Sequence, residues 1–176
     1  MEIFLKSVEK KAFQMIRIAT GSIDDALDIL QDSMMSFVRH YSNKNESEWA
    51  PLFYRVVQNK IRDWYRKQKV KKLVFRYLPG SFKPESEIAP NPIEQVEDKR
   101  NTDALTELKN RQAIKKLNQV LKKLPGKQQQ AFLLRAWEGL STKETARAMK
   151  CSEGTVKTHY FRAMGKLKKE LEETWP

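Results

Sequence analysis

Residues 139–163 read GLSTKETARAMKCSEGTVKTHYFRA, and this stretch predicts a helix, a tight turn and a second helix. Gly139 can end a preceding helix with a positive φ. Ser141 followed three residues later by Glu144 is typical of a capping box at the start of a helix. The three residues from Lys150 to Ser152 have the length of the turn in a helix-turn-helix. The stretch therefore predicts a helix-turn-helix.

The second helix of this motif has two different faces. Val156, Tyr160 and Ala163 recur at helical spacing on an apolar face. The other face carries hydrogen-bond donors, namely Lys157, Thr158, His159 and Arg162. Donors of this kind suit the base edges and phosphates of a DNA major groove. The alternative is an ordinary helical hairpin with a solvated basic face.

Composition and charge favour a nucleic-acid partner. The chain has 176 residues, a net charge of +12 and a pI of about 9.8. Residues 1–76 and 111–176 carry net charges of +6 and +9, whereas residues 77–110 carry −3. With a single cysteine, Cys151, and two histidines, neither an internal disulfide nor a structural zinc site is expected. We find no signal peptide and no run of membrane-spanning length, and we expect a cytoplasmic protein without membrane insertion.

Helical periodicity also precedes the motif. We expect three helices in the first part of the chain, over residues 2–19, over residues 22–41, and after a polar loop at 42–46. Ser22 and Ser47 are expected to cap the second and third helices, and Pro51 to lie in the first turn of the third. The second helix has a broad apolar face made of Ala26, Ile29, Leu30, Ser33, Met34, Phe37, Val38 and Tyr41.

A proline-rich segment divides the chain. Four of the seven prolines fall between Pro79 and Pro92, and no periodicity survives there. A helical pattern returns from about Asp98, and further apolar stripes over 114–124 and 128–137 lead into the motif. We predict an all-α protein with two small helical domains joined by a flexible linker, with boundaries at 1–78, 79–110 and 111–176.

Two further features leave alternatives open. Asp25, Asp28 and Asp32 form an acidic stripe that could hold Mg²⁺ in a nuclease, but no second carboxylate cluster or catalytic histidine accompanies it. We therefore expect no metal, no cofactor and no enzymatic activity. Between Arg62 and Tyr77, basic residues alternate with aromatic ones. This pattern suits base stacking on a single strand, and equally helix packing beneath lysine and arginine side chains.

Several motifs together resemble the sigma factors of bacterial RNA polymerase. In the C-terminal part these are LP at 124–125, FLLR at 132–135, EGLS at 138–141, GTVK at 154–157 and FRA at 161–163. DALDILQD at residues 25–32 resembles the polymerase-docking helix of that family, and NKIRDWYR at 59–66 resembles the end of its second region. With these two regions and a short linker, the chain resembles the extracytoplasmic-function (ECF) branch of the sigma-70 family.

The resemblance implies three groups of site residues. Core RNA polymerase would be bound through Asp25, Asp28, Ile29, Gln31 and Asp32. The melted minus-10 element of promoter DNA would be held by Asn43, Asn45, Asn59, Arg62, Trp64, Arg66, Lys67 and Lys69. The duplex minus-35 element would be read by Ser152, Gly154, Thr155, Lys157, Thr158, His159, Phe161 and Arg162.

The same resemblance implies an anti-sigma factor as a further partner. It also exposes a departure, because His159 stands where the family often has arginine. The nearest rival is an autonomous helix-turn-helix regulator of the LuxR type, since residues 155–159 also resemble that class. That rival offers no account of residues 22–72.

Overall fold

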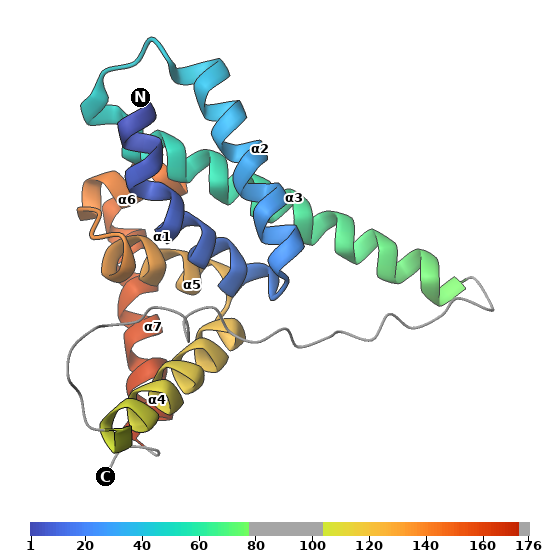
Figure 1. The fold of residues 1–176 in the computed structure, drawn as a ribbon, viewed down its shortest axis with the longest axis vertical. Coiled ribbons are helices and arrows are strands. Elements are labelled where there is room, and N and C mark those ends of the chain that lie inside the picture. Colours follow the sequence, from blue (N-terminus) through green and yellow to red (C-terminus); the bar gives the residue numbers. More distant parts are fainter. Residues whose placement is uncertain (78–103, 173–176) are drawn as a thin grey trace.

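The computed structural model describes the backbone of residues 1–77 and 104–172, and the side chains of residues 1–71 and 113–171. The described residues form helices without strands, which confirms the all-α prediction (Figure 1). The N-terminal half contains α1 (Glu2–Thr20), α2 (Ile23–Tyr41) and α3 (Glu46–Tyr77). The C-terminal half contains α4 (Ala104–Lys123), α5 (Gly126–Phe132), a π-helical turn η2 (Leu133–Trp137), α6 (Thr142–Met149) and α7 (Glu153–Glu172).

Local sequence signals set the connection between α1 and α2. Gly21 ends α1 in the left-handed region, with φ of 78°, and its N–H donates to the Arg17 carbonyl. The Ser22 hydroxyl then accepts a hydrogen bond from the Asp25 N–H at 3.2 Å, which caps α2 as predicted. The chain therefore reverses within two residues, and α1 packs along α2 (Figure 1).

The predicted start of the third helix is wrong by two residues. Helix α3 begins at Glu46, so Ser47 lies inside its first turn and does not cap it. Pro51 consequently lies in the second turn, where its missing N–H leaves the Ser47 carbonyl without its usual donor. Ser47 is exposed, so water can satisfy that carbonyl.

Aromatic side chains form the centre of the N-terminal half. Phe4, Phe37 and Phe53 bring α1, α2 and α3 together, with ring centroids between 5.6 and 6.0 Å apart. Phe37 and Phe53 are fully buried. The contacts of Phe53 with Phe4 and Phe37 are edge-to-face, and such contacts stabilise a core beyond the burial of apolar area.

The helix-turn-helix forms as the sequence predicts. Ser141 and Glu144 make a reciprocal capping box at the start of α6, and these hydrogen bonds hold the pKa of Glu144 below its usual range. Lys150 ends α6 in the left-handed region with φ of 52°. The Ser152 hydroxyl accepts from the Thr155 N–H at 3.2 Å and caps α7. Gly139 has the positive φ expected of it, 75°.

Two features of the C-terminal half differ from the sequence prediction. Helix α4 begins at Ala104, so the last part of the segment predicted as linker is helical. The helix predicted over 128–137 begins at Gly126 and changes to a π-helical turn at Leu133. There the Glu138 N–H donates to the Leu133 carbonyl at 3.0 Å, five residues back.

The two halves pack against each other. Their buried apolar residues form one continuous cluster, in which α3 and α6 make the main contact between halves. The C-terminal part of α3 projects away from this body (Figure 1).

Candidate nucleic-acid interface

One face of α7 presents polar side chains to solvent. Thr155, Thr158 and Arg162 are exposed and lie within one side of the helix, because 3.6 residues make a turn. Ser152 and Gly154 stand beside them at the exposed start of the helix. The Thr158 hydroxyl donates to the Gly154 carbonyl at 3.0 Å, and the Ser152 and Thr155 hydroxyl oxygens lie 2.9 Å apart. The helix therefore offers hydroxyl and guanidinium groups that a duplex groove can meet.

The other residues expected to read the duplex lie at the edges of this face. Lys157 is exposed about 100° around the helix from Thr158, a position suited to a phosphate. His159 is partly buried, and its Nδ1 is enclosed with no hydrogen-bond partner among the described residues. In the turn before α7, burial raises the pKa of the Cys151 thiol, which packs against the core.

Phe161 belongs to an apolar groove as well as to the exposed side of α7. Its side chain is 79% exposed. The groove has a volume of about 500 Å³ and lies between α4 and α7, with a lining that includes Leu117, Phe132, Met164 and Leu171. Phe161 can therefore offer apolar contact, but no hydrogen bond, to a groove of duplex DNA.

Helix α3 carries the second basic surface. Asn59, Arg62, Arg66 and Lys69 lie on one side of it, and the last three are exposed. Arg62 donates to the Asn59 side-chain oxygen, and Arg66 pairs with Asp63 at 3.0 Å. Such exposed pairs exchange readily for phosphate oxygens because they contribute little to stability.

The structure separates Trp64 from that surface. Trp64 lies on the opposite side of α3, partly buried against the core cluster, and its Nε1 has no partner among the described residues. The Tyr65 hydroxyl donates to the Ala19 carbonyl at 2.5 Å. Of the two alternatives that the sequence left open, these contacts favour helix packing for Trp64.

The remaining residues expected at the minus-10 element are spread along α3. Asn43 and Asn45 are exposed in the loop before α3, where the Trp49 Nε1–H donates to the Lys44 carbonyl at 2.8 Å. Because a helix rises 1.5 Å per residue, Asn59 lies about 20 Å along α3 from that loop. Lys67 is exposed but points away from the side shared by Asn59 and Arg66.

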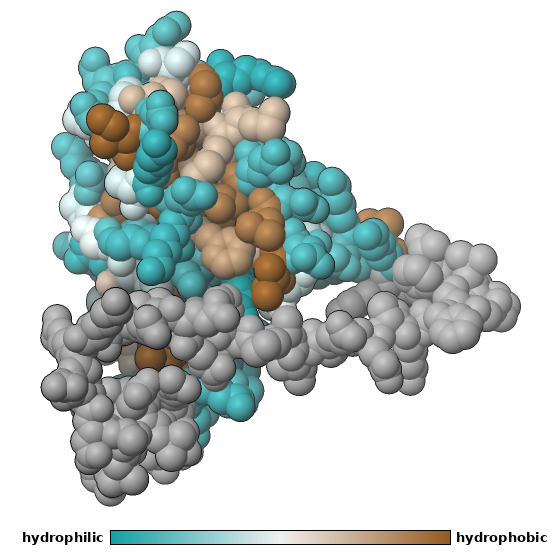
Figure 2. All heavy atoms as spheres, viewed as in Figure 1, coloured by the Kyte–Doolittle hydropathy of each residue, from teal (hydrophilic) through white to brown (hydrophobic). Residues whose placement is uncertain are grey.

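Helix α2 exposes an apolar surface that the sequence prediction missed. Leu27 and Met35 are 51% and 56% exposed, and Val38, which was predicted to be in the core, is 42% exposed. Gln31 lies between them, and we refer to these four residues as the α2 face. Figure 2 shows hydrophobic side chains gathered over α2, with hydrophilic ones around them. Large exposed apolar side chains in one row indicate a protein-binding surface.

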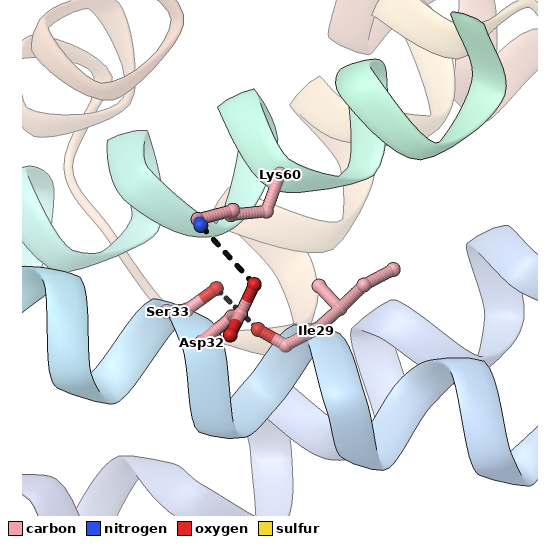
Figure 3. Close-up of polar contacts among 4 residues, drawn as sticks. All are labelled: Ile29, Asp32, Ser33 and Lys60. Atoms are coloured by element: carbon pink, nitrogen blue, oxygen red, sulfur yellow. Dashed lines mark hydrogen bonds and ion pairs between the residues drawn. The ribbon is translucent and has the colours of Figure 1, made fainter. Parts of the chain in front are cut away.

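The acidic residues of α2 lie beside this face. Asp28 is exposed, whereas Asp25 is partly buried near the cap. Asp32 pairs with Lys60 of α3, with 3.2 Å between Oδ2 and Nζ (Figure 3). Ile29, included in the expected docking set, is only 8% exposed and belongs to the core, so we withdraw it.

Within residues 1–71 and 113–171, no group of three or more His, Cys, Asp or Glu side chains is arranged to hold a metal ion. None of the helices described is both long and apolar enough to cross a membrane.

Comparison with known proteins decides the family. Residues 114–167, which run from within α4 through α6 to most of α7, match the family model described as "Sigma-70, region 4". The chain is 30% identical over 148 residues to the RNA polymerase sigma-E factor of Streptomyces coelicolor, covering 84% of this chain and 72% of that protein. It is 27% identical to the ECF RNA polymerase sigma factor SigM of Bacillus subtilis, covering 81% and 77%. The chain belongs to the ECF branch of the sigma-70 family.

The fold of this sigma factor is similar to that of two solved structures. The sigma factor RpoE from Bartonella quintana, solved in complex with the anti-sigma factor NepR, matches with a TM-score of 0.65 and 20% identity. That match covers 97% of this chain and 96% of RpoE. CnrH, solved with the cytosolic domain of CnrY, matches with a TM-score of 0.62 and 19% identity, covering 98% and 87%.

Proposed function

We propose that this sigma factor binds core RNA polymerase and directs it to promoters, where it takes part in promoter melting and transcription initiation. It acts by recognition and strand capture, without catalysis of its own, and in the cytoplasm, where polymerase and promoter DNA meet. The observation that carries the proposal is the presence of three separate surfaces on one small chain: the α2 face, the basic side of α3, and the exposed side of α7.

Each surface has a role that its chemistry suits. The α2 face, with Asp28 and Asp32 at its edge, docks on core polymerase through apolar contact and charge. Asn59, Arg62, Arg66 and Lys69 hold the backbone of the melted minus-10 strand. Thr155, Thr158 and Arg162 read the minus-35 duplex, and Lys157 contacts a phosphate.

A rival function is autonomous regulation by the helix-turn-helix alone. It leaves the α2 face and the basic side of α3 without a purpose. The two solved structures described above are complexes with partner proteins, and RpoE was solved with an anti-sigma factor. We extend a partner of that kind to this chain as part of the proposal.

The experiment that tests the function is transcription in vitro from a genomic library with purified core polymerase. Addition of this protein should produce a set of new start sites that share minus-10 and minus-35 elements. Co-purification with core polymerase but no new start sites would rule out a promoter-directing role.

The exposed side of α7 gives a prediction about duplex readout. Arg162→Ala should weaken binding by about 1–3 kcal/mol at promoters that carry one particular base pair, because a base contact is lost. Transcription from those promoters should fall accordingly. Lys157→Ala should weaken binding to all promoters alike, and it should reduce the slope of log affinity against log salt concentration by about one. Both effects can be read from a library of promoters with randomised minus-35 elements.

His159→Arg serves as the matched gain-of-contact variant on the same helix. It should shift the preferred minus-35 sequence, since arginine recognises guanine more strongly. If neither Arg162→Ala nor His159→Arg alters the preference within that element, α7 does not read the minus-35 sequence through this side.

A further inference from the structure

A cavity of about 310 Å³ lies where α3 faces α5 and the end of α6. Side chains of α3 form one wall, and residues from the start of α5 and the last turn of α6 form the other. Cavities that bind small molecules in proteins measure about 300–1,000 Å³. This cavity therefore has the size of a site for one small ligand.

Positive charge gathers on the lining of this cavity. Arg62, Lys127 and Lys150 line it, and none of its lining residues is acidic. The Arg62 guanidinium donates to the side-chain oxygen of Asn59, which also lines the cavity. Neither lysine makes a hydrogen bond or an ion pair within the part of the chain that the structure describes. Three cations without a carboxylate favour an anionic ligand, and phosphate groups above all.

Lys150 stands on this lining in an unfavourable backbone conformation. It ends α6 in the left-handed region, and among the described residues other than glycine it alone has a positive φ, 52°. Glycine is the usual residue at such a helix end, because a Cβ is strained there. Non-glycine residues held in this region cluster at functional sites. A lysine where glycine would relieve the strain indicates that its cation has a use, and the cavity is what that cation lines.

The rest of the lining suits a flat ring with polar edges. Ile61 and Met149, both largely buried, contribute apolar surface. The Tyr65 side chain is 42% exposed and offers an aromatic ring on which a base can stack. The side-chain amides of Gln58 and Gln130 carry both donors and acceptors, as base edges require.

Charge and chemistry together select one class of ligand. A nucleoside diphosphate carries roughly three negative charges near neutral pH, since its terminal phosphate titrates with a second pKa near 6. Three cations on the lining match that charge. An inorganic anion would leave the aromatic ring, the apolar surface and the amides unused, whereas a nucleobase engages all of them.

We propose that this cavity binds a nucleoside diphosphate, with Arg62, Lys127 and Lys150 on the phosphates and with Tyr65 and the two glutamine amides on the base. This site is separate from the proposed function, because neither polymerase nor promoter DNA takes part in it. Arg62 is the one cation that it shares with the proposed minus-10 surface.

The site is tested by isothermal titration calorimetry on the full chain, with ADP, GDP, inorganic pyrophosphate and adenosine as separate probes. The variants are Lys150→Gly and Lys127→Ala, and neither residue belongs to a surface assigned to promoter DNA. Lys150→Gly should retain or raise the thermal midpoint of the ligand-free protein, because glycine relieves the strained backbone. The matched control is Lys143→Ala, which removes an exposed lysine of α6 that does not line the cavity.

ADP and GDP should each bind once per chain, and each should raise the thermal midpoint. Lys150→Gly and Lys127→Ala should each weaken that binding by about tenfold, because each variant loses a charge-assisted contact. Lys143→Ala should leave it within about twofold. Pyrophosphate and adenosine should each bind at least about tenfold more weakly than the nucleotides, since each probe lacks one half of the ligand.

Three results would overturn the proposal. Absence of binding by both nucleotides would exclude the site, and an equal loss with Lys143→Ala would show attraction by net charge alone. Pyrophosphate that binds as tightly as ADP would reduce the site to a cluster of cations.

A DNA strand is the other polyanion that could meet these cations. Fluorescence anisotropy with a fluorescein-labelled oligo(dT) strand of about 20 nucleotides measures its binding to the same variants. We expect Lys150→Gly to change strand binding by less than about twofold. A loss as large as the loss in nucleotide binding would assign the cavity to the DNA backbone and overturn the nucleotide site.

Discussion

Replacing Leu27 and Met35 together by aspartate should reduce the affinity for core RNA polymerase by at least about tenfold. Each side chain is just over half exposed in the free protein, so burying the exposed half against a partner contributes about half of the 1.5–3 kcal/mol of full burial. Two such contacts amount to at least about 1.5 kcal/mol, and every 1.4 kcal/mol is tenfold in affinity. The substitutions also place two carboxylates where apolar contact is expected, which adds a desolvation cost.

The fold should tolerate these changes, because exposed substitutions usually shift stability by less than about 0.5 kcal/mol. Ile3→Asp is the matched control, since Ile3 is an apolar side chain 86% exposed on α1, outside the α2 face. Binding is measured by titrating labelled core enzyme, and helicity by circular dichroism. An equal loss with Ile3→Asp, or no loss with the double variant, would remove the α2 face from the interface.

The double variant Arg62→Ala, Arg66→Ala should reduce open-complex formation by about 100-fold or more while initial promoter binding changes far less. Each arginine is exposed on the basic side of α3, and a charge-assisted contact contributes about 1.5–3 kcal/mol. Losing both contacts to the separated strand weakens the melted state in particular. Permanganate footprinting measures melting, and a template premelted at the minus-10 element should restore activity.

Trp64→Ala is the contrasting variant on the same helix. Because Trp64 packs against the core, we expect it to lower thermal stability and to gain nothing from premelting. Rescue of Trp64→Ala by the premelted template would instead assign this side chain to base stacking. Failure of the template to rescue the arginine variant would exclude those arginines from melting.

Features that depend on neighbouring residues could be predicted from the sequence. The capping box of Ser141 and Glu144, the cap at Ser22 and the positive φ of Gly21 each arise within a few residues of chain. The helix-turn-helix is therefore predictable, because its turn and both of its helix starts are encoded locally.

Which residues at the edge of each apolar face are buried was harder to predict, because periodicity indicates an apolar face but not its width. The broad face expected for α2 included Val38, which is exposed, and left out Leu27 and Met35. Leu27 and Met35 stand on the polar side of the helix, and an apolar residue there is the signal that could have marked a binding surface. Ile29 was expected both on the apolar face of the second helix and among the polymerase-binding residues, and its burial places it in the core.

Contacts between distant residues gave no signal in the sequence. Tyr54 and Glu138 share a hydrogen bond although they are 84 residues apart in the chain, and neither residue is unusual in its local sequence. The π-helical turn before Glu138 and the packing of α3 on α6 result from tertiary structure. The arrangement of the two halves was therefore beyond a reading of local patterns.

Specific promoter recognition should belong to this chain only together with core polymerase. Alone, the protein offers one duplex-reading helix and the basic side of α3, so its DNA binding should be non-specific, at about 10⁻⁴–10⁻⁶ M. Polymerase would hold both surfaces at promoter spacing and make the second contact effectively intramolecular.

The most direct measurement is a footprint of the purified protein on a promoter identified by the transcription assay, with and without core enzyme. We predict protection at both the minus-35 and the minus-10 elements with polymerase, and none from the protein alone. A strong, symmetric footprint from the protein alone, with half-sites about one helical turn apart, would contradict the account and indicate an autonomous dimeric regulator.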